Sequence, residues 1–120
     1  MFVRFLVADD EEGWAKQRGV LTEFYRLDQE GELLSHEEER FREAQTWLNA
    51  HLPRPDALSP NRPDTPDRAV RWLRLSAAEH VSCMRALAAL LESKGIPVQE
   101  IVSEDPGRIV YEDDYQVAVI

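Results

Sequence analysis

The clearest pattern in the chain is a helical repeat of apolar residues between Ser76 and Gly95. Ser76 is a suitable N-cap, and Glu79, three residues later, can complete a capping box. Gly95 can adopt the left-handed conformation that ends a helix, and Pro97 prevents the helix from continuing. The apolar residues recur at helical spacing on one face: Val81, Met84, Leu87, Ala88 and Leu91. We therefore predict a helix whose apolar face packs on a sheet.

In two earlier segments the apolar residues also recur at helical spacing. Residues 11–30 are predicted to be a helix, although Gly13 and Gly19 each weaken it by about 1 kcal/mol relative to alanine. Its apolar positions are Trp14, Leu21, Phe24, Tyr25 and Leu27. Residues 36–51 form the second helix, which Ser35 begins with another capping box. The apolar stripe of this second helix is Phe41, Ala44, Trp47, Leu48 and Leu52.

Residues 2–8 form a short run of strand-forming side chains with apolar residues on both faces. Such a run is typical of an interior strand in a covered sheet. Arg4 would then be an unusual inward charge, which either reaches water past the end of the sheet, pairs with an acid or binds an anion. Residues 69–75 also suit a strand, since the helix that follows needs an extended entry.

The segment 53–66 contains five of the seven prolines. Proline removes a backbone donor and restricts the residue before it, so no regular structure is expected in this segment. It is predicted to be a loop that either wraps around the domain or moves. Long irregular loops in compact domains are often functional or disordered.

The last quarter of the chain alternates between short apolar segments and turns. Three strands are expected, over residues 98–103, 108–112 and 115–120. Pro106-Gly107 and Asp113-Asp114 are turn signals between these strands. Two-residue turns would place Val110 opposite Val117, and the three strands would form an antiparallel meander.

This part of the chain also resembles a known group of proteins. The run GRIVYEDDYQVAV, together with AAEHVSCMRALAALLESKGIPV before it, is similar to small uncharacterised bacterial proteins with such a helix and an acidic, tyrosine-containing hairpin. The resemblance covers residues 70–120. It implies a bacterial, single-domain protein, and it carries over no catalytic residue.

The predicted elements give an α+β fold formed by one domain over residues 1–120. Their order is β-α-α-β-α-β-β-β, with a sheet of about five strands, mixed or antiparallel, and with the helices mainly on one face. The final strand, 115–120, is rich in apolar residues. As an exposed edge it would be a site for pairing with a second copy, so a homodimer through a sheet edge is plausible.

Charge narrows the classes of partner. The chain has 23 acidic and 14 basic residues and a formal net charge of −9. Phosphate binding depends on Lys and Arg, so this balance argues against general nucleic-acid binding. It fits either a charge that serves only solubility or a protein partner with a basic surface.

The sequence contains few signals that indicate the cellular compartment of the protein. No apolar run is long enough to span a bilayer, and the first residues lack the pattern of a signal peptide. Cys83 is the single cysteine, so no intrachain disulfide can form. We expect a cytoplasmic protein with no membrane association.

The start of the helix predicted at 76–95 is the best candidate for a ligand site. Arg74 lies just upstream, and Glu79 and His80 lie in the first turn, where exposed amides favour anions. Arg4 is the fourth candidate ligand-binding residue. The hypothesis is a small anionic-ligand-binding domain or a modest enzyme, without the glycine-rich loop of a nucleotide site.

Metal and thiol chemistry have less support. His80 and Cys83 are neighbours on the helix surface, but a metal site needs about three or four protein ligands and the sequence supplies two. A thiolate nucleophile would use Cys83 with His80 as its base, whereas Cys83 beside the core residue Met84 suits a small buried side chain. We therefore assign no metal ligand, cofactor or catalytic residue, and the sequence leans away from an enzyme.

The acidic hairpin end is the candidate partner site. Its residues are Tyr111, Glu112, Asp113, Asp114 and Tyr115. They form either a solvated turn or a recognition tip for a basic partner. Three functions stay open: a non-enzymatic protein-interaction or regulatory module, the ligand site near Arg74, Glu79 and His80, and an acidic mimic of nucleic acid.

Overall fold

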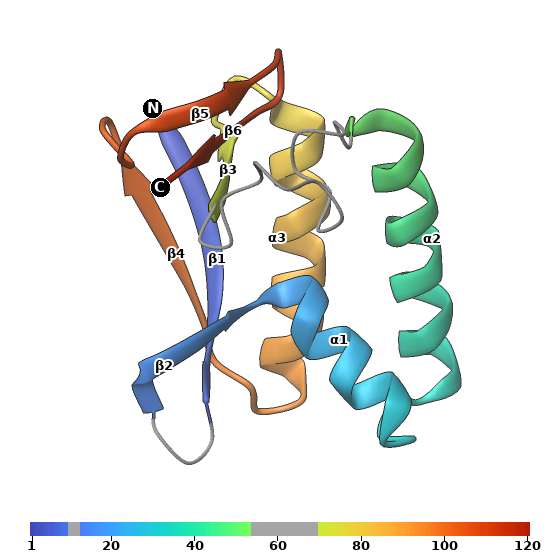
Figure 1. Ribbon diagram of the computed structural model, residues 1–120. Coiled ribbons are helices and arrows are strands. Elements are labelled where there is room, and N and C mark those ends of the chain that lie inside the picture. Colours follow the sequence, from blue (N-terminus) through green and yellow to red (C-terminus); the bar gives the residue numbers. More distant parts are fainter. Residues whose placement is uncertain (10–12, 54–69) are drawn as a thin grey trace, which may run out of the picture.

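The computed structural model describes residues 1–9, 13–53 and 70–120, and the side chains of all of these except 9 and 13–17 (Figure 1). The described residues form six strands and three helices, which confirms the α+β class. In chain order they are β1 (Phe2–Asp9), β2 (Gly13–Gly19), α1 (Val20–Gln29), α2 (Ser35–His51), β3 (Val70–Arg74), α3 (Ala78–Ser93), β4 (Val98–Ser103), β5 (Ile109–Glu112) and β6 (Gln116–Val119). Most of the predicted loop at 53–66 lies outside the described residues.

Strand β1 is the centre of the sheet, as its apolar character on both faces predicts. On one side it pairs with β4 along Phe2–Val7, and on the other it pairs first with β3 and then with β2. All of these pairings are antiparallel. Val3, Phe5 and Val7 are buried in the core cluster with residues of α1, α2 and α3. The sheet has six strands where five were expected, because β2 is an additional strand.

The prediction that residues 11–30 form one helix is wrong. Residues 13–19 pair with β1 as strand β2, with Gly19 opposite Leu6, and helix α1 begins only at Val20. The reason is that a hairpin partner satisfies these backbone groups in extended form, and the two glycines at the ends of β2 weaken the competing helix. The Trp14 side chain lies outside the described residues.

The C-terminal prediction is right about the strands and wrong about their pairing. Strand β4 pairs with β1, so only β5 and β6 form a hairpin and the three-stranded meander does not exist. The hairpin register also differs, since Val117 lies opposite Glu112 and Val110 has no partner on β6. The strand order is β2-β1-β3-β6-β5, with β4 also paired to β1, so β6 is an interior strand and β5 is an edge strand. The prediction of an edge at 115–120 is therefore wrong for β6.

Both predicted capping boxes are wrong in detail. Ala77 is the N-cap of α3 and makes no side-chain cap hydrogen bond, so Ser76 does not cap this helix. At α2 the Leu34 amide donates to the carboxylate of Glu37, at 2.8 Å, in place of the predicted box begun by Ser35. The predicted end of α3 is confirmed, because Gly95 follows it with φ of 82°.

The helices lie on one face of the sheet, as predicted (Figure 1). The apolar face of α3 is buried in the core, including Val81, Leu87 and Leu91. Helix α2 packs on α3 and also reaches α1, where the Phe24 and Phe41 rings stack with centroids 5.0 Å apart. In the described part of the chain no helix is long and apolar enough to cross a membrane.

Candidate functional site

Three elements that are distant in sequence converge on one cavity. They are the C-terminal end of α2, the first turn of α3 and the turn between β5 and β6. The cavity has a volume of about 680 Å³. Its lining residues are Asn49, Ala50, His51, Leu52, Pro53, Glu79, His80 and Tyr115. We call it the histidine pocket.

Asp113 organises the turn that brings Tyr115 to this pocket. Its Oδ1 accepts hydrogen bonds from the Tyr115 and Gln116 amides at 2.8 and 3.0 Å, and its Oδ2 accepts from the Tyr111 hydroxyl at 2.7 Å. Burial alone would raise the pKa of Asp113, but these hydrogen bonds outweigh it and hold the pKa below its ordinary value. The buried Gln116 side chain then donates to the Pro53 carbonyl at 2.8 Å, which ties the turn to the end of α2.

A row of four rings stands along the pocket. Tyr115 stacks on His80 with ring centroids 4.6 Å apart, and the edge of His80 meets Trp47 at 4.8 Å. Trp47 in turn stacks on His51 at 4.5 Å. His80 is 5% exposed, so this ring is fixed by packing from both sides. The pocket wall is therefore rigid where these rings meet.

The hydrogen bonds of the two histidines determine which nitrogen of each ring is a donor. His80 Nε2 lies 2.8 Å from the His51 carbonyl, and His51 Nδ1 lies 2.8 Å from the Trp47 carbonyl. A carbonyl oxygen only accepts, so both of these ring nitrogens must be donors. In the neutral imidazole the other nitrogen is then an acceptor: Nδ1 of His80 and Nε2 of His51. In their neutral form the two imidazoles therefore each keep one nitrogen that can accept a hydrogen bond.

Glu79 supplies a negative charge to the pocket. Among the described residues that line the pocket it is the single carboxylate, and none of them is Lys or Arg. Its side chain is exposed and makes no hydrogen bond or ion pair with the described residues. The pocket thus combines an available carboxylate with acceptor nitrogens.

The structure brings Glu79 and His80 together as predicted, but it turns Arg74 elsewhere. The Arg74 guanidinium donates to the Asp113 carbonyl at 2.8 Å and to the Glu112 carboxylate at 2.9 Å. It also lies over the Phe2 ring, 5.6 Å from the centroid. Arg74 therefore holds the β5–β6 turn and does not line the histidine pocket.

Arg4 also lies apart from the pocket. It is half-buried, and its guanidinium carbon lies 5.9 Å from the centroid of the Trp72 ring. Burial lowers the pKa of Arg4 below its ordinary value. Stacking on an aromatic face thus stabilises this half-buried charge. None of the three roles predicted for Arg4 from the sequence includes such stacking.

The predicted recognition tip at residues 111–115 is largely engaged within the protein. Tyr111 and Asp113 bond to each other, and Glu112 is paired with Arg74. Asp114 is exposed, and Tyr115 lies on His80 at the pocket wall. Of this segment, Tyr115 is the residue that enters the candidate site.

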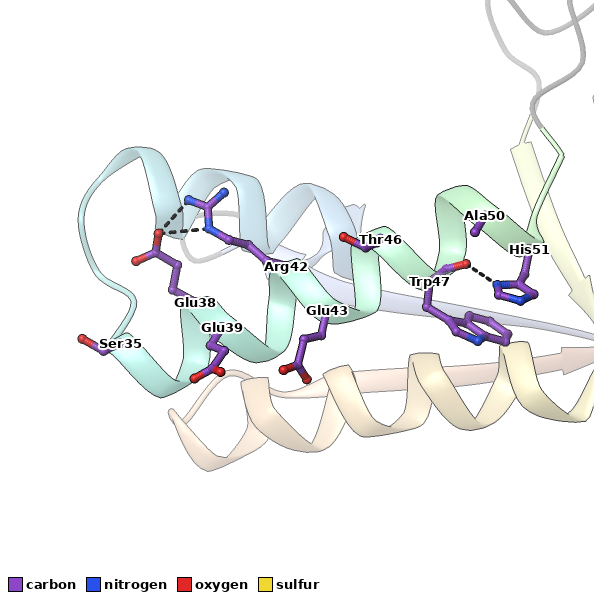
Figure 2. Close-up of a pocket in the computed structure, with 9 residues that line it drawn as sticks. All are labelled: Ser35, Glu38, Glu39, Arg42, Glu43, Thr46, Trp47, Ala50 and His51. Carbon is purple, nitrogen blue, oxygen red and sulfur yellow. Dashed lines mark hydrogen bonds and ion pairs between the residues drawn. The ribbon is translucent and has the colours of Figure 1, made fainter.

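The outward face of α2 continues from the pocket. A shallow hollow on this face shares Ala50 and His51 with the histidine pocket. Figure 2 shows its nine lining residues: Ser35, Glu38, Glu39, Arg42, Glu43, Thr46, Trp47, Ala50 and His51. The Glu38 carboxylate is paired with Arg42 at 2.6 Å, whereas Glu39 and Glu43 are exposed and make no ion pair with the described residues. This face therefore carries unneutralised negative charge up to the pocket.

Thiol and metal chemistry find little support at the site. Burial raises the pKa of the half-buried Cys83 thiol, which opposes the thiolate form that a nucleophile needs. Within residues 1–9, 13–53 and 70–120 no group of three His, Cys, Asp or Glu side chains is placed to hold a metal ion. The two histidines of the pocket are engaged with backbone carbonyls and aromatic rings instead.

Comparisons of the chain with protein-family models, curated proteins and solved structures find no match. The resemblance to small bacterial proteins therefore stays a prediction. His51 was not predicted to be a site residue, and Trp47 was predicted only as part of the apolar stripe of its helix. Their positions at the end of α2, next to a proline-rich segment, were the available signal.

Proposed function

We propose that the protein is a non-enzymatic interaction module that binds a basic segment of a partner protein. One Arg or Lys side chain of the partner enters the histidine pocket. The observation that carries this proposal is the polarity of the pocket, where the Glu79 carboxylate and the neutral forms of His51 and His80 provide acceptors and none of the described lining residues is Lys or Arg.

A guanidinium or ammonium group is the complement of such a lining. Arg presents five N–H donors and Lys three, and neither side chain has an acceptor. The Glu79 carboxylate supplies the counter-charge, and the partly exposed Tyr115 ring offers an aromatic surface at which a cation is favoured. A carboxylate or phosphate would meet acceptors and a like charge in the same place.

The adjoining face of α2 supports a basic segment rather than an isolated cation. Glu39 and Glu43 lie one helical turn apart on this face and line the same hollow as His51 (Figure 2). Further basic residues of the partner can lie over them. The net charge of −9 favours the encounter with a basic partner at long range.

The anionic-ligand alternative rests on the first turn of α3. Its N-cap, Ala77, provides no side-chain acceptor, so the helix amides there can attract an anion. Against this, Glu79 already places a negative charge at that helix end, and Arg74 is engaged by Glu112. We therefore favour the cationic partner.

The mimic of nucleic acid is less well supported, because many carboxylates are already neutralised. Acid–base pairs include Glu23–Arg26, Glu30–Arg26, Glu37–Lys94, Glu38–Arg42, Glu100–Arg85 and Glu112–Arg74. A mimic requires rows of free carboxylates at phosphate-like spacing. Charges that pair within the protein cannot serve in such rows.

The test is an NMR titration of the ¹⁵N-labelled protein with two short peptides that differ only in carrying arginine or glutamate. The arginine peptide is expected to shift the amide signals of His51, Glu79, His80 and Tyr115, and the glutamate peptide is not. Glu79→Gln should weaken binding by about two- to fivefold, since an exposed ion pair contributes about 0.5–1 kcal/mol. Glu104→Gln is the matched control, because Glu104 is exposed and does not line the pocket.

Two results would contradict the proposal. One is a set of shifted amides that excludes the pocket and the outward face of α2. The other is equal binding by the Glu79→Gln and Glu104→Gln variants. If inorganic phosphate, and not the arginine peptide, shifts the first turn of α3, the anionic alternative replaces the proposal.

A further inference from the structure

Strand β5 is an edge strand of the sheet, as are β2 and β4, each of which pairs only with β1 among the described residues. It pairs with β6 on one side, and in the described part of the chain no strand pairs with its other side (Figure 1). An unpaired edge presents free backbone N–H and C=O groups to any extended chain. Proteins usually protect such edges or use them.

The side chains at this edge are unusually apolar for a free surface. Ile109 is 44% exposed and Val110 is 36% exposed. Ile120, which is 50% exposed, lies beside them, since its amide donates to the Arg108 carbonyl at 3.0 Å. The edge therefore combines open backbone groups with a small apolar patch.

The order of charges along β5 distinguishes between possible partners. The segment 108–112 reads Arg-Ile-Val-Tyr-Glu, with a cation at one end and an anion at the other. Arg108 is exposed and makes no ion pair with the described residues. Glu112 is 62% exposed and bonds Arg74 through Oε2, which leaves Oε1 available. Each end of the segment can thus accept one more charged partner.

The geometry points to a second copy of this chain as the partner of β5, paired antiparallel about a two-fold axis at Val110. In this register Arg108 of each copy faces Glu112 of the other, and Ile109 faces Tyr111. Residues directly opposite each other on antiparallel strands interact, and opposite charges stabilise the pair. A two-fold axis makes both of these ion pairs form at once.

Other arrangements of the same edge are disfavoured. A parallel copy in register would place Arg108 against Arg108 and Glu112 against Glu112. Shifting the antiparallel register by one residue would bring Glu112 opposite the apolar Ile109. The interface uses none of the lining residues of the histidine pocket, so it is independent of the proposed function.

The test uses sedimentation velocity of the full chain at low salt and two charge reversals. The wild-type protein is expected to dimerise with a dissociation constant in the micromolar range, of the order of 10–100 µM for so small an interface. Arg108→Glu and Glu112→Arg should each weaken self-association by about tenfold or more, since either reversal replaces two attractive pairs with repulsive ones. Arg40→Glu makes the same charge change as Arg108→Glu at an exposed position of α2, and it should leave self-association unchanged.

Mixing the two reversed variants gives the sharper result. In the mixed dimer the two substituted side chains, a glutamate at position 108 and an arginine at position 112, face each other across the axis. The unchanged Glu112 of the first variant likewise faces the unchanged Arg108 of the second. The mixture should therefore form dimers that neither variant forms alone. Val110→Lys, which places two lysines on the two-fold axis, is a second disrupting variant that leaves the Arg74–Glu112 pair in place.

Three outcomes would overturn the inference. The wild-type protein could stay monomeric up to about 500 µM, well above the expected range. A dimer could form that none of these substitutions changes, which would place the interface elsewhere. The two reversed variants could also fail to associate on mixing although each is folded by circular dichroism.

Discussion

The buried ion pair between α2 and α3 gives the sharpest prediction about stability. Lys94 Nζ donates to Glu37 Oε1 at 2.8 Å and to the Glu32 carbonyl at 3.1 Å. The same Glu37 oxygen accepts from the Leu34 amide at 2.8 Å. The Glu37 side chain is 4% exposed. This pair therefore joins the start of α2 to the end of α3 with little access to water.

Replacing Lys94 with methionine keeps most of the apolar stem and removes the charge. Removing one partner of a buried pair costs about 3–5 kcal/mol, because the other charge stays buried without compensation. Here the Lys94 side chain is 17% exposed and Glu37 keeps the Leu34 amide, so water and one hydrogen bond still stabilise the carboxylate. We therefore expect Lys94→Met to lower the free energy of unfolding at pH 7 by about 2–3 kcal/mol.

The pH dependence of this loss of stability shows whether the Glu37–Lys94 ion pair causes it. Burial would raise the pKa of Glu37, but the hydrogen bonds from Lys94 and Leu34 outweigh it and hold the pKa below its ordinary value. A depressed folded pKa stabilises the protein above the unfolded pKa, and this stabilisation is lost as pH falls through the folded pKa. In the Lys94→Met variant this stabilisation is absent. The difference between wild type and variant should thus shrink as pH falls from 7 through the unfolded pKa of glutamate, about 4.3, toward the folded pKa.

The assay is urea unfolding followed by circular dichroism at pH 7 and at pH 3. The double variant Lys94→Met/Glu37→Gln is the control, since the amide can still accept from Leu34 and carries no buried charge. At pH 7 it should recover at least about half of the loss. The reasoning is wrong if the single variant loses the same free energy at both pH values, or if the double variant is no more stable than the single one.

Two further predictions concern the site. Asp113→Ala should destabilise the protein by about 2–3 kcal/mol in urea unfolding at pH 7, because the Tyr115 and Gln116 amides lose their acceptor. Since the folded pKa of Asp113 is lowered, that loss should diminish as pH falls below about 4, and a loss independent of pH would contradict the assigned role. The Cys83 thiol, whose pKa is raised by burial, should react with a disulfide reagent more slowly at pH 7 than a cysteine in an unstructured peptide. A rate faster than that of the peptide would show an activated thiol and favour the enzymatic alternative.

Local patterns in the sequence predicted the elements that bury one continuous apolar face. The stripe from Val81 to Leu91 predicts α3, and the two apolar faces of 2–8 predict an interior strand. The same method failed at residues 13–19, where the pairing with β1 outweighs helical spacing. A hairpin partner supplies hydrogen bonds that no periodicity of the segment itself reveals.

Predictions about individual site residues were also right where they depended on local position and wrong where they depended on distant contacts. Glu79 and His80 were named from their position at the start of α3, and the structure places both at the pocket. Arg74 was named for the same reason but is held by Glu112, whose pairing depends on the hairpin register. His51 joins the pocket because α2 ends beside α3. Spacing within α2 carries no information about that neighbour.

The sequence by itself determined the α+β class, the lengths of α2 and α3 and the acidic character of the chain, because these depend on residue type and short-range spacing. Only the tertiary structure decided that β4 pairs with β1, that β5 is an edge strand and that His51, His80 and Tyr115 share a pocket. Contacts between segments tens of residues apart depend on which surfaces bury best together. That competition involves the whole chain, so no single stretch of sequence contains its result.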